Sequence, residues 1–225
     1  MFTDIANFTT ISESMTTERL LQHISEYLDN LTTIILAEQG TVDKYIGDAI
    51  MCFWGAPNPV EEQEAHSCLT ALRCLAKLRE LNARWATEGK PALNTRFGIS
   101  SGDVSVGNMG SSDRMNYTVL GDAVNLASRL EAINKYYGTD IIIGENTYAA
   151  VKDRFCFLPI DVVAVKGKTR GVRIYQLLAG SENDGDLAPS AAILSLKSLT
   201  ERAFTAYLKK DFKTALKHYT ELRKK

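Results

Sequence analysis

The sequence predicts an α+β fold in which helices pack on a ferredoxin-like (split βαβ) sheet, followed by a C-terminal helical hairpin. Two observations predict it. Apolar residues recur at spacings of three and four in several long segments, which is the period of an amphipathic helix. Short apolar runs between glycine and proline positions are typical of strands. The segments follow the order strand, helix, strand, strand, helix, strand, with extra strands, which is the split βαβ plan.

The first element is strand-like, because Met1 and Ile5 are apolar and no polar segment precedes them. A domain rarely begins within a strand, so we expect a piece of a longer protein whose N-terminal regulatory domain is absent. A turn rich in Asn, Thr and Ser follows. Residues 17–39 then predict a helix with Thr16 as N-cap and Gly40 at its C-terminal end. The apolar stripe of this helix is Leu20, Leu21, Ile24, Leu28, Leu31, Ile34 and Ile35.

A β-hairpin is predicted next, over residues 41–46 and 49–54. Apolar side chains fill both segments, and Gly47 between them tolerates the positive φ of a tight turn. A proline-containing break separates the hairpin from a second helix over residues 60–86. The apolar residues of that helix are Ala65, Cys68, Leu69, Leu72, Leu75, Leu78 and Leu81.

The rest of the chain predicts short strands, two further helices and a separate tail. Residues 1–179 form one domain, residues 180–190 (GSENDGDLAPS) form a linker by composition, and residues 191–225 form a helical tail. The tail resembles one tetratricopeptide-type helix pair, which cannot bury its own apolar face alone; a simple amphipathic tail fits equally well. The intervening elements are two short strands within 95–110, strands 116–120, 141–143, 155–165 and 172–178, and helices 122–137 and 145–152.

Composition narrows the function classes. The 225 residues, 45% hydrophobic and 24% charged, suit one large or two small soluble domains. A net charge of -1 predicts no nucleic-acid partner. Cys52, Cys68, Cys74 and Cys156 lack CxxC spacing and are predicted to be buried free thiols. No run reaches the roughly 18 apolar residues of a membrane span, so we expect a cytoplasmic domain, whether or not its parent protein is anchored to a membrane.

Two carboxylates are candidate metal ligands. Asp4 ends the first strand, and Asp48 lies in the hairpin turn. The first strand and the hairpin are neighbours in a split βαβ sheet, so both side chains can meet at one edge. Paired carboxylates often hold Mg²⁺ that also contacts phosphates. Taken alone, the pair fits the backbone needs of a turn better than a metal site.

Three further segments carry candidate phosphate or nucleotide contacts. The backbone N–H groups of residues 5–9 can bind a polyphosphate, as helix starts do. Asn125 and Arg129 are four apart and share one face of the helix 122–137. Lys166, in a basic turn before the last strand, suits a terminal phosphate. Each of these features is also common on an ordinary protein surface.

Four segments together resemble the catalytic domain of class III nucleotidyl cyclases, in the order and spacing of that family over about residues 1–180. The resemblance implies a cyclase-type fold, a homodimer with two active sites shared across the interface, and two Mg²⁺ or Mn²⁺ ions per site. It covers most of the chain and specifies the Lys/Thr subclass of adenylate cyclases. The segments are FTDIANFT (2–9), DKYIGDAIMCFWG (43–55), NYTVLGDAVNLASRLE (116–131) and VKGK (165–168).

The resemblance also implies roles for single residues. Asp4 and Asp48, with the backbone of Ile5, match the metal ligands of the family. Asn125 matches the residue that orients the ribose, and Arg129 matches the residue that stabilises charge on the α-phosphate. The positions that match phosphate contacts are Phe8, Thr9 and Lys166.

Lys44 and Thr118 match the pair that reads the purine. A lysine only donates hydrogen bonds, which suits N1 of adenine, and a threonine hydroxyl can accept from the adenine amino group. Guanylate cyclases commonly carry an acidic residue at the position of Lys44. Many family members carry aspartate at the position of Thr118, and that departure defines the Lys/Thr subclass.

The sequence therefore predicts an adenylate cyclase, in which the ribose 3′-hydroxyl of ATP attacks the α-phosphorus in line and pyrophosphate leaves. A guanylate cyclase is the alternative enzyme; a diguanylate cyclase lacks support, because the hairpin turn reads IGDA and not a GGDEF-like sequence. A non-catalytic cyclase-homology dimerisation module is the third hypothesis. Loss of a metal ligand, of Asn125 or of Arg129 would favour it, and all of them are present.

Overall fold

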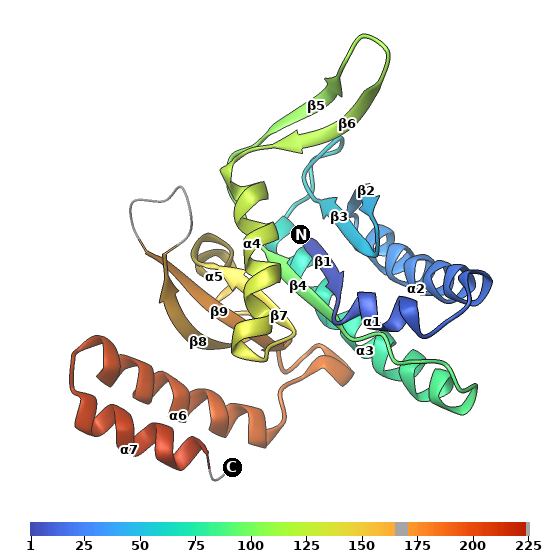
Figure 1. Cartoon of the computed structure of the whole chain (residues 1–225). Coiled ribbons are helices and arrows are strands. Elements are labelled where there is room, and N and C mark those ends of the chain that lie inside the picture. The colour runs from blue at the N-terminus through green and yellow to red at the C-terminus, as the bar shows by residue number, and fades with distance from the viewer. Residues whose placement is uncertain (165–170, 224–225) are drawn as a thin grey trace.

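The structure, a computed structural model, describes residues 1–164 and 171–223. A seven-stranded sheet with the strand order β2-β3-β1-β4-β7-β9-β8 forms its centre, and helices cover both faces (Figure 1). The predicted α+β, ferredoxin-like class is confirmed. The strands of this sheet are β1 (Phe2–Ile5), β2 (Thr41–Ile46), β3 (Ala49–Phe53), β4 (Thr95–Ile99), β7 (Ile141–Gly144), β8 (Cys156–Val163) and β9 (Val172–Ala179).

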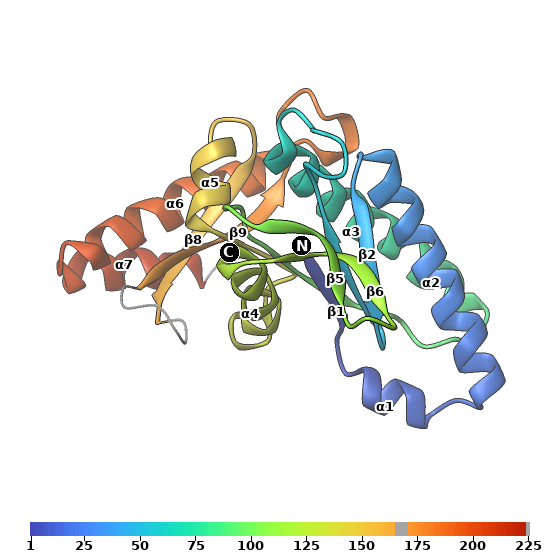
Figure 2. The same ribbon diagram turned by 90° about the horizontal axis from the view of Figure 1, so that it is seen from above.

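The helices divide between the two faces of the sheet, as the two perpendicular views show (Figures 1 and 2). α2, α3 and α5 pack on one face, and α4 crosses the other. No helix in the described ranges is long and apolar enough to cross a membrane. The helices are α1 (Phe8–Glu13), α2 (Thr17–Ala37), α3 (Gln63–Thr87), α4 (Asp122–Tyr137), α5 (Glu145–Val151), α6 (Ala191–Leu208) and α7 (Phe212–Leu222), with a short 3₁₀ turn at Gly185–Leu187.

The β7 strand explains why both faces need cover. Successive side chains of a strand point to opposite faces, and this strand begins with three isoleucines. Ile141 and Ile143 are buried in the main core with α2 and α3, whereas Ile142 packs with Leu126 and Leu130 of α4. A helix on only one side would leave part of this apolar run in water.

Two further strands lie outside the seven-stranded sheet. β5 (Ser105–Gly110) and β6 (Met115–Leu120) pair with each other as a separate antiparallel ribbon, which projects beyond the main sheet (Figure 1). The prediction of one single sheet is therefore wrong for these strands. Near the base of the ribbon, Val119 packs with Met51 and Phe53 of β3, so the ribbon is anchored beside the β2–β3 hairpin.

The α1 helix was not predicted, because its six residues are too few to show a helical period. It follows Asn7, which adopts a φ of 59°, and Phe8 and Ile11 pack against the main core. A turn was expected here, and the chain instead forms a short helix directly after β1.

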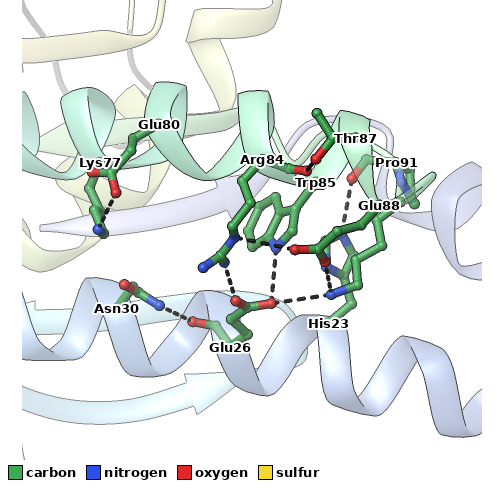
Figure 3. Close-up of polar contacts among 11 residues, drawn as sticks. His23, Glu26, Asn30, Lys77, Glu80, Arg84, Trp85, Thr87, Glu88 and Pro91 are labelled. Atoms are coloured by element: carbon green, nitrogen blue, oxygen red, sulfur yellow. Dashed lines mark hydrogen bonds and ion pairs between the residues drawn. The ribbon is translucent and has the colours of Figure 1, made fainter.

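Polar contacts fix α2 against α3 (Figure 3). The carboxylate of Glu26 accepts a hydrogen bond of 2.9 Å from Trp85 Nε1 and forms an ion pair with Arg84. His23 lies against Trp85 and contacts the Pro91 carbonyl oxygen at 2.9 Å. Because α2 also packs on β2, these contacts support the strand that carries the predicted base-reading lysine.

The α4 helix lies unusually close to β4. A Cβ added at Gly98 would lie 2.1 Å from the Ala127 carbonyl oxygen and 2.2 Å from the Glu131 nitrogen, so only glycine permits this approach. The buried Asn134 amide donates to the Phe97 carbonyl oxygen at 2.9 Å and thereby ties the two elements together. These contacts position the helix that carries Asn125 and Arg129.

The C-terminal segment forms the predicted helical hairpin. α6 and α7 pack on each other, and α6 packs on β8 at the edge of the sheet (Figure 1). Its buried side chains include Leu199, Ala203 and Phe204. Part of the apolar surface of α6 is thus covered within this chain, whereas Leu194, Tyr207 and Leu208 are exposed. The four cysteines are buried and free, as predicted.

Candidate active site

Asp4 and Asp48 meet at the end of β1. The strand pairs with β3, with Thr3 opposite Ile50, and this register brings the β2–β3 turn to the C-terminal end of β1. Gly47 in that turn has a φ of 65°, as the sequence predicts. The Ile5 N–H donates a hydrogen bond of 3.0 Å to Asp48 Oδ2.

The electrostatics of this edge favour a cation. Burial and the nearby Asp48 charge raise the pKa of Asp4, while Arg96, 3.5 Å from Asp4 Oδ2, opposes that rise. Burial, followed by the charge of Asp4, raises the pKa of Glu131 on α4 to about 7. Glu131 Oε1 is buried and accepts no hydrogen bond among the described residues. Three carboxylates therefore share a region in which the Arg96 charge acts to lower the pKa values of Asp4 and Glu131.

This edge fits a divalent metal ion. Its donors are hard carboxylate oxygens, and a cation would oppose the two effects that raise the pKa of Asp4, which are burial and then the repulsion from Asp48. Within the described ranges, no group of three or more His, Cys, Asp or Glu side chains is arranged as a metal cage. Proteins usually bind Mg²⁺ through one or two carboxylates, and substrate phosphates complete its coordination shell. Asp4 and Asp48 could supply two such carboxylates.

Lys44 and Thr118 approach each other across a contact between β2 and β6. Between them lies Asp43, whose side chain is fully buried at 0% exposure. The Thr118 hydroxyl donates a hydrogen bond to Asp43 Oδ2, and Lys44 Nζ lies 3.2 Å from Asp43 Oδ1. Asp43 is a candidate site residue that the sequence analysis missed, and its position directly before the lysine in DKYIGD was the available signal.

Asn125 and Arg129 lie on α4, which follows β6 after a tight turn at Gly121. A Cβ at Gly121 would lie 2.9 Å from Val104 Cγ1 and 3.0 Å from the Asp103 carbonyl oxygen. Asn125 is exposed and Arg129 is half-buried. The expected shared stripe of these two residues is therefore present on the helix.

The two halves of the predicted site point in different directions within one chain. Glu131 approaches Asp4 and Asp48 closely enough for their charges to raise its pKa. Arg129 is two residues earlier on the same helix, which places it about 200° away around the helix axis. The stripe that carries Arg129 thus faces away from the metal-binding edge of its own chain.

The remaining predicted residues lie near β1 or outside the description. Phe8 and Thr9 are the first two residues of α1, where Phe8 is partly buried and Thr9 is exposed. Lys166 lies outside the described residues.

The chain resembles known proteins over most of its length. Residues 1–179 match the family model described as the adenylate and guanylate cyclase catalytic domain. Adenylate cyclase 1 of Rhizobium meliloti is 38% identical over 178 residues, which are 79% of this chain and 27% of that protein. The adenylate cyclase of Anabaena cylindrica is 34% identical over 183 residues, which are 80% of this chain and 36% of that protein. The chain thus spans only about a third of these relatives, or less.

Solved structures also resemble the chain over most of its length. The crystal structure of the adenylyl cyclase CyaB from P. aeruginosa superposes with a TM-score of 0.75 and 34% identity, covering 82% of this chain and 94% of that one. The crystal structure of the guanylyl cyclase Cya2 superposes with a TM-score of 0.76 and 29% identity, covering 84% of this chain and 94% of that one.

Proposed function

The chain belongs to the adenylate and guanylate cyclase catalytic domain family, and on that premise we propose that it converts ATP to 3′,5′-cyclic AMP and pyrophosphate as a homodimer. Two observations carry this proposal. Lys44 and Thr118 both contact Asp43, and the carboxylates of Asp4 and Asp48 lie together at the end of β1. Similarity to proteins named adenylate cyclase supports it.

Membership of the family implies dependence on a divalent metal. We assign its ligands to Asp4 and Asp48, with the Ile5 carbonyl, and propose two Mg²⁺ or Mn²⁺ ions per site. When bound, such ions raise the acidity of an attacking hydroxyl and neutralise charge on a leaving phosphate. The hydrogen bond from Ile5 N–H holds one carboxylate oxygen of Asp48, which fixes the direction of the other.

The residues of this chain then bind and orient the nucleotide. Asn125 orients the ribose so that the 3′-hydroxyl lies in line with the α-phosphorus. Arg129 stabilises the charge that develops on the α-phosphate oxygens. Phe8 and Thr9 line the phosphates at the start of α1, and Lys166 binds the terminal phosphates. The 3′ oxygen forms the new bond to the α-phosphorus and releases its proton to solvent, while pyrophosphate takes the electron pair of the broken P–O bond.

Base choice follows from the donors and acceptors of Lys44 and Thr118. Adenine offers an acceptor at N1 and a donor at its amino group, whereas guanine offers the reverse pattern at these two positions. Each mismatched buried group costs about 1–3 kcal/mol. The pair therefore favours ATP over GTP by one to a few orders of magnitude.

The dimer follows from the opposed directions of Arg129 and the metal-binding edge. Two copies related by a two-fold axis would bring the Arg129 stripe of each to the carboxylates of the other. Exposed apolar side chains on β2, on β6 and around β5 offer a surface for that contact. They are Tyr45, Ile46, Val104, Val106, Met115, Tyr117 and Leu120.

The test is incubation of the purified chain with ATP or GTP and Mn²⁺, with chromatographic detection of the cyclic product. We expect cyclic AMP and a much slower formation of cyclic GMP. Dominant cyclic GMP would favour the guanylate cyclase alternative. The absence of both products from a chain that forms dimers would favour the non-catalytic dimerisation module.

A further inference from the structure

We propose that Asp43 is a positioning residue that sets the hydrogen-bond polarity of Thr118, so that the threonine presents only acceptor lone pairs to the 6-position of the purine. This inference deepens the proposed function and rests on it. It assigns base selectivity to three side chains, Asp43, Lys44 and Thr118, two of which contact the base.

A β-bulge brings Asp43 to this position. Neighbouring residues of a regular strand point to opposite faces, so Asp43 and Lys44 would normally diverge. Here Val42 pairs with Cys52 and Lys44 pairs with Met51, so one extra residue, Asp43, is inserted in β2. Bulges redirect side chains in this way. The result is an ion pair between adjacent residues, with Lys44 Nζ 3.2 Å from Asp43 Oδ1.

The contact with Thr118 has a single chemically consistent direction. An ionised carboxylate only accepts hydrogen bonds, and a threonine hydroxyl has one proton to give. The Thr118 hydroxyl donates that proton to Asp43 Oδ2. The Thr118 hydroxyl oxygen then has only its lone pairs to offer a ligand. These accept a hydrogen bond from an amino group but repel a carbonyl oxygen. Adenine carries an amino group at its 6-position, and guanine carries an oxygen there.

Burial makes this arrangement costly to reverse. The Asp43 side chain is 0% exposed, and Thr118 is 8% exposed. A buried carboxylate needs partners to offset its lost hydration. Here Oδ2 accepts the hydrogen bond of the Thr118 hydroxyl, whereas Oδ1 accepts no hydrogen bond among the described residues and has the Lys44 ammonium as its ion-pair partner. Reversing the Thr118 hydroxyl would remove one of these partners. The polarity of the threonine is thus fixed before the nucleotide binds.

The test compares two nucleotides that differ only at the 6-position. The triphosphates of adenosine and of purine riboside share the N1 acceptor, so the contribution of Lys44 cancels in their ratio. Used as 3′-deoxy forms, both lack the attacking hydroxyl, and titration calorimetry with Mg²⁺ then measures their Kd values without turnover. We expect the wild type to bind the adenosine form about five- to tenfold more tightly, which is the effect of one hydrogen bond.

The Asp43→Asn variant replaces one carboxylate oxygen by an amide N–H group, so Thr118 and Lys44 no longer each face an acceptor. We expect its Kd ratio to fall to about 1–2, as in Thr118→Val, and the double variant to match the single ones. Asp29→Asn, the same change on the exposed side of α2, should keep the wild-type ratio. A general loss of structure would weaken both ligands equally and leave the ratio unchanged.

The inference would be overturned if Asp43→Asn kept the wild-type Kd ratio while Thr118→Val lost it. Equal binding of the two nucleotides by the wild type would also overturn it. Product formation from ATP by the wild type is measured in parallel. A chain that discriminates the two 3′-deoxy nucleotides but forms no cyclic AMP would contradict the proposed function while supporting the role of Asp43.

Discussion

Lys44 and Asp48 are only four residues apart, yet the structure sends them to different partners. Lys44 pairs with Asp43 beside Thr118, whereas Asp48 accepts from the Ile5 N–H at the end of β1. A solvated ion pair across the hairpin turn would have been the simplest explanation for two opposite charges at this spacing. The bulge at Asp43 and the turn at Gly47 separate them instead, so one hairpin can supply residues for the two roles that we propose.

The Asp48→Asn variant tests the metal-binding edge. Asparagine keeps an oxygen that can accept from the Ile5 N–H but removes the negative charge, so the fold should persist while metal affinity falls. We expect kcat to fall at least about a hundredfold, as for the loss of a group that stabilises transition-state charge. Cyclic AMP formation measures this, with size-exclusion chromatography as a check on the dimer; Asp29→Asn should be as active as the wild type. Activity retained by Asp48→Asn would contradict its role.

Glu131 makes the stability of the metal-free protein depend on pH. Its folded-state pKa of about 7 lies above the ordinary value of 4.5, so the folded state binds the proton more tightly than the unfolded state does. The stabilisation is complete below pH 4.5 and is lost as the pH rises through 7. Because Glu131 is only partly buried, we discount the loss for solvent screening to about 1 kcal/mol.

Denaturant unfolding at pH 5 and pH 8 with a chelator present measures this loss. Glu131→Gln should lose about 1 kcal/mol less stability than the wild type over that range, because glutamine does not titrate. Glu13→Gln, on the exposed surface of α1, should behave as the wild type does. An identical pH dependence in Glu131→Gln and the wild type would count against a raised pKa at Glu131.

Among the elements, α4 carries two of the proposed site residues. It holds Asn125 and Arg129 on an outer stripe and Glu131 toward the carboxylates, and its height above the sheet is set by Gly98 on β4. A glycine in a strand often marks a site where another part of the backbone approaches closely. The sequence shows this glycine within TRFGIS but carries no sign of what lies over it.

Gly98→Ala should therefore displace α4. The added methyl would meet the backbone of Ala127 and Glu131 at 2.1 and 2.2 Å, and backbone cannot yield as a flexible side chain does. We expect a loss of about 2–4 kcal/mol in the free energy of unfolding and a fall in activity larger than the unfolded fraction explains. Gly144→Ala is the matched control, because its methyl would meet Leu130 of the same helix at an ordinary 3.5 Å. Equal stability of the two variants would contradict the close packing of α4 on β4.

For the whole molecule, the decisive feature is that the two proposed half-sites of one chain face apart. The metal-binding edge at β1 and the outer stripe of α4 cannot serve the same nucleotide from one copy if Arg129 lies about 200° from Glu131. A two-fold symmetric dimer would solve this problem, because each of the two sites at its interface would then combine one half-site from each copy.

Mixing two inactive variants tests this arrangement. In a heterodimer of Asp48→Asn and Arg129→Ala, one site contains both defects and the other contains neither. With random assembly, half of the dimers are mixed and half of their sites are intact, so we expect about a quarter of wild-type activity. Mass spectrometry confirms that heterodimers form. Their formation without recovered activity would show that Asp48 and Arg129 act on one nucleotide from the same chain.

The sequence by itself determined the α+β class, most element boundaries and the family, because apolar periodicity, turn residues and long motifs are local properties of the chain. It also identified the hairpin turn and the stripe of Asn125 and Arg129. It missed α1, whose single short stretch carries too little periodicity, and it assigned β5 and β6 to the main sheet.

Only the tertiary structure decided where distant side chains meet. The contact of Asp43 with Thr118 joins residues 75 positions apart. The raised pKa of Glu131 depends first on its burial and then on the charges of Asp4 and Asp48, which lie far from it in the sequence. A strand pattern assigns adjacent residues to opposite faces, and a single inserted residue in β2 reverses that assignment without any change in composition. Such contacts depend on the bulge in β2 and on packing between elements, and the spacing of residues along the chain shows neither.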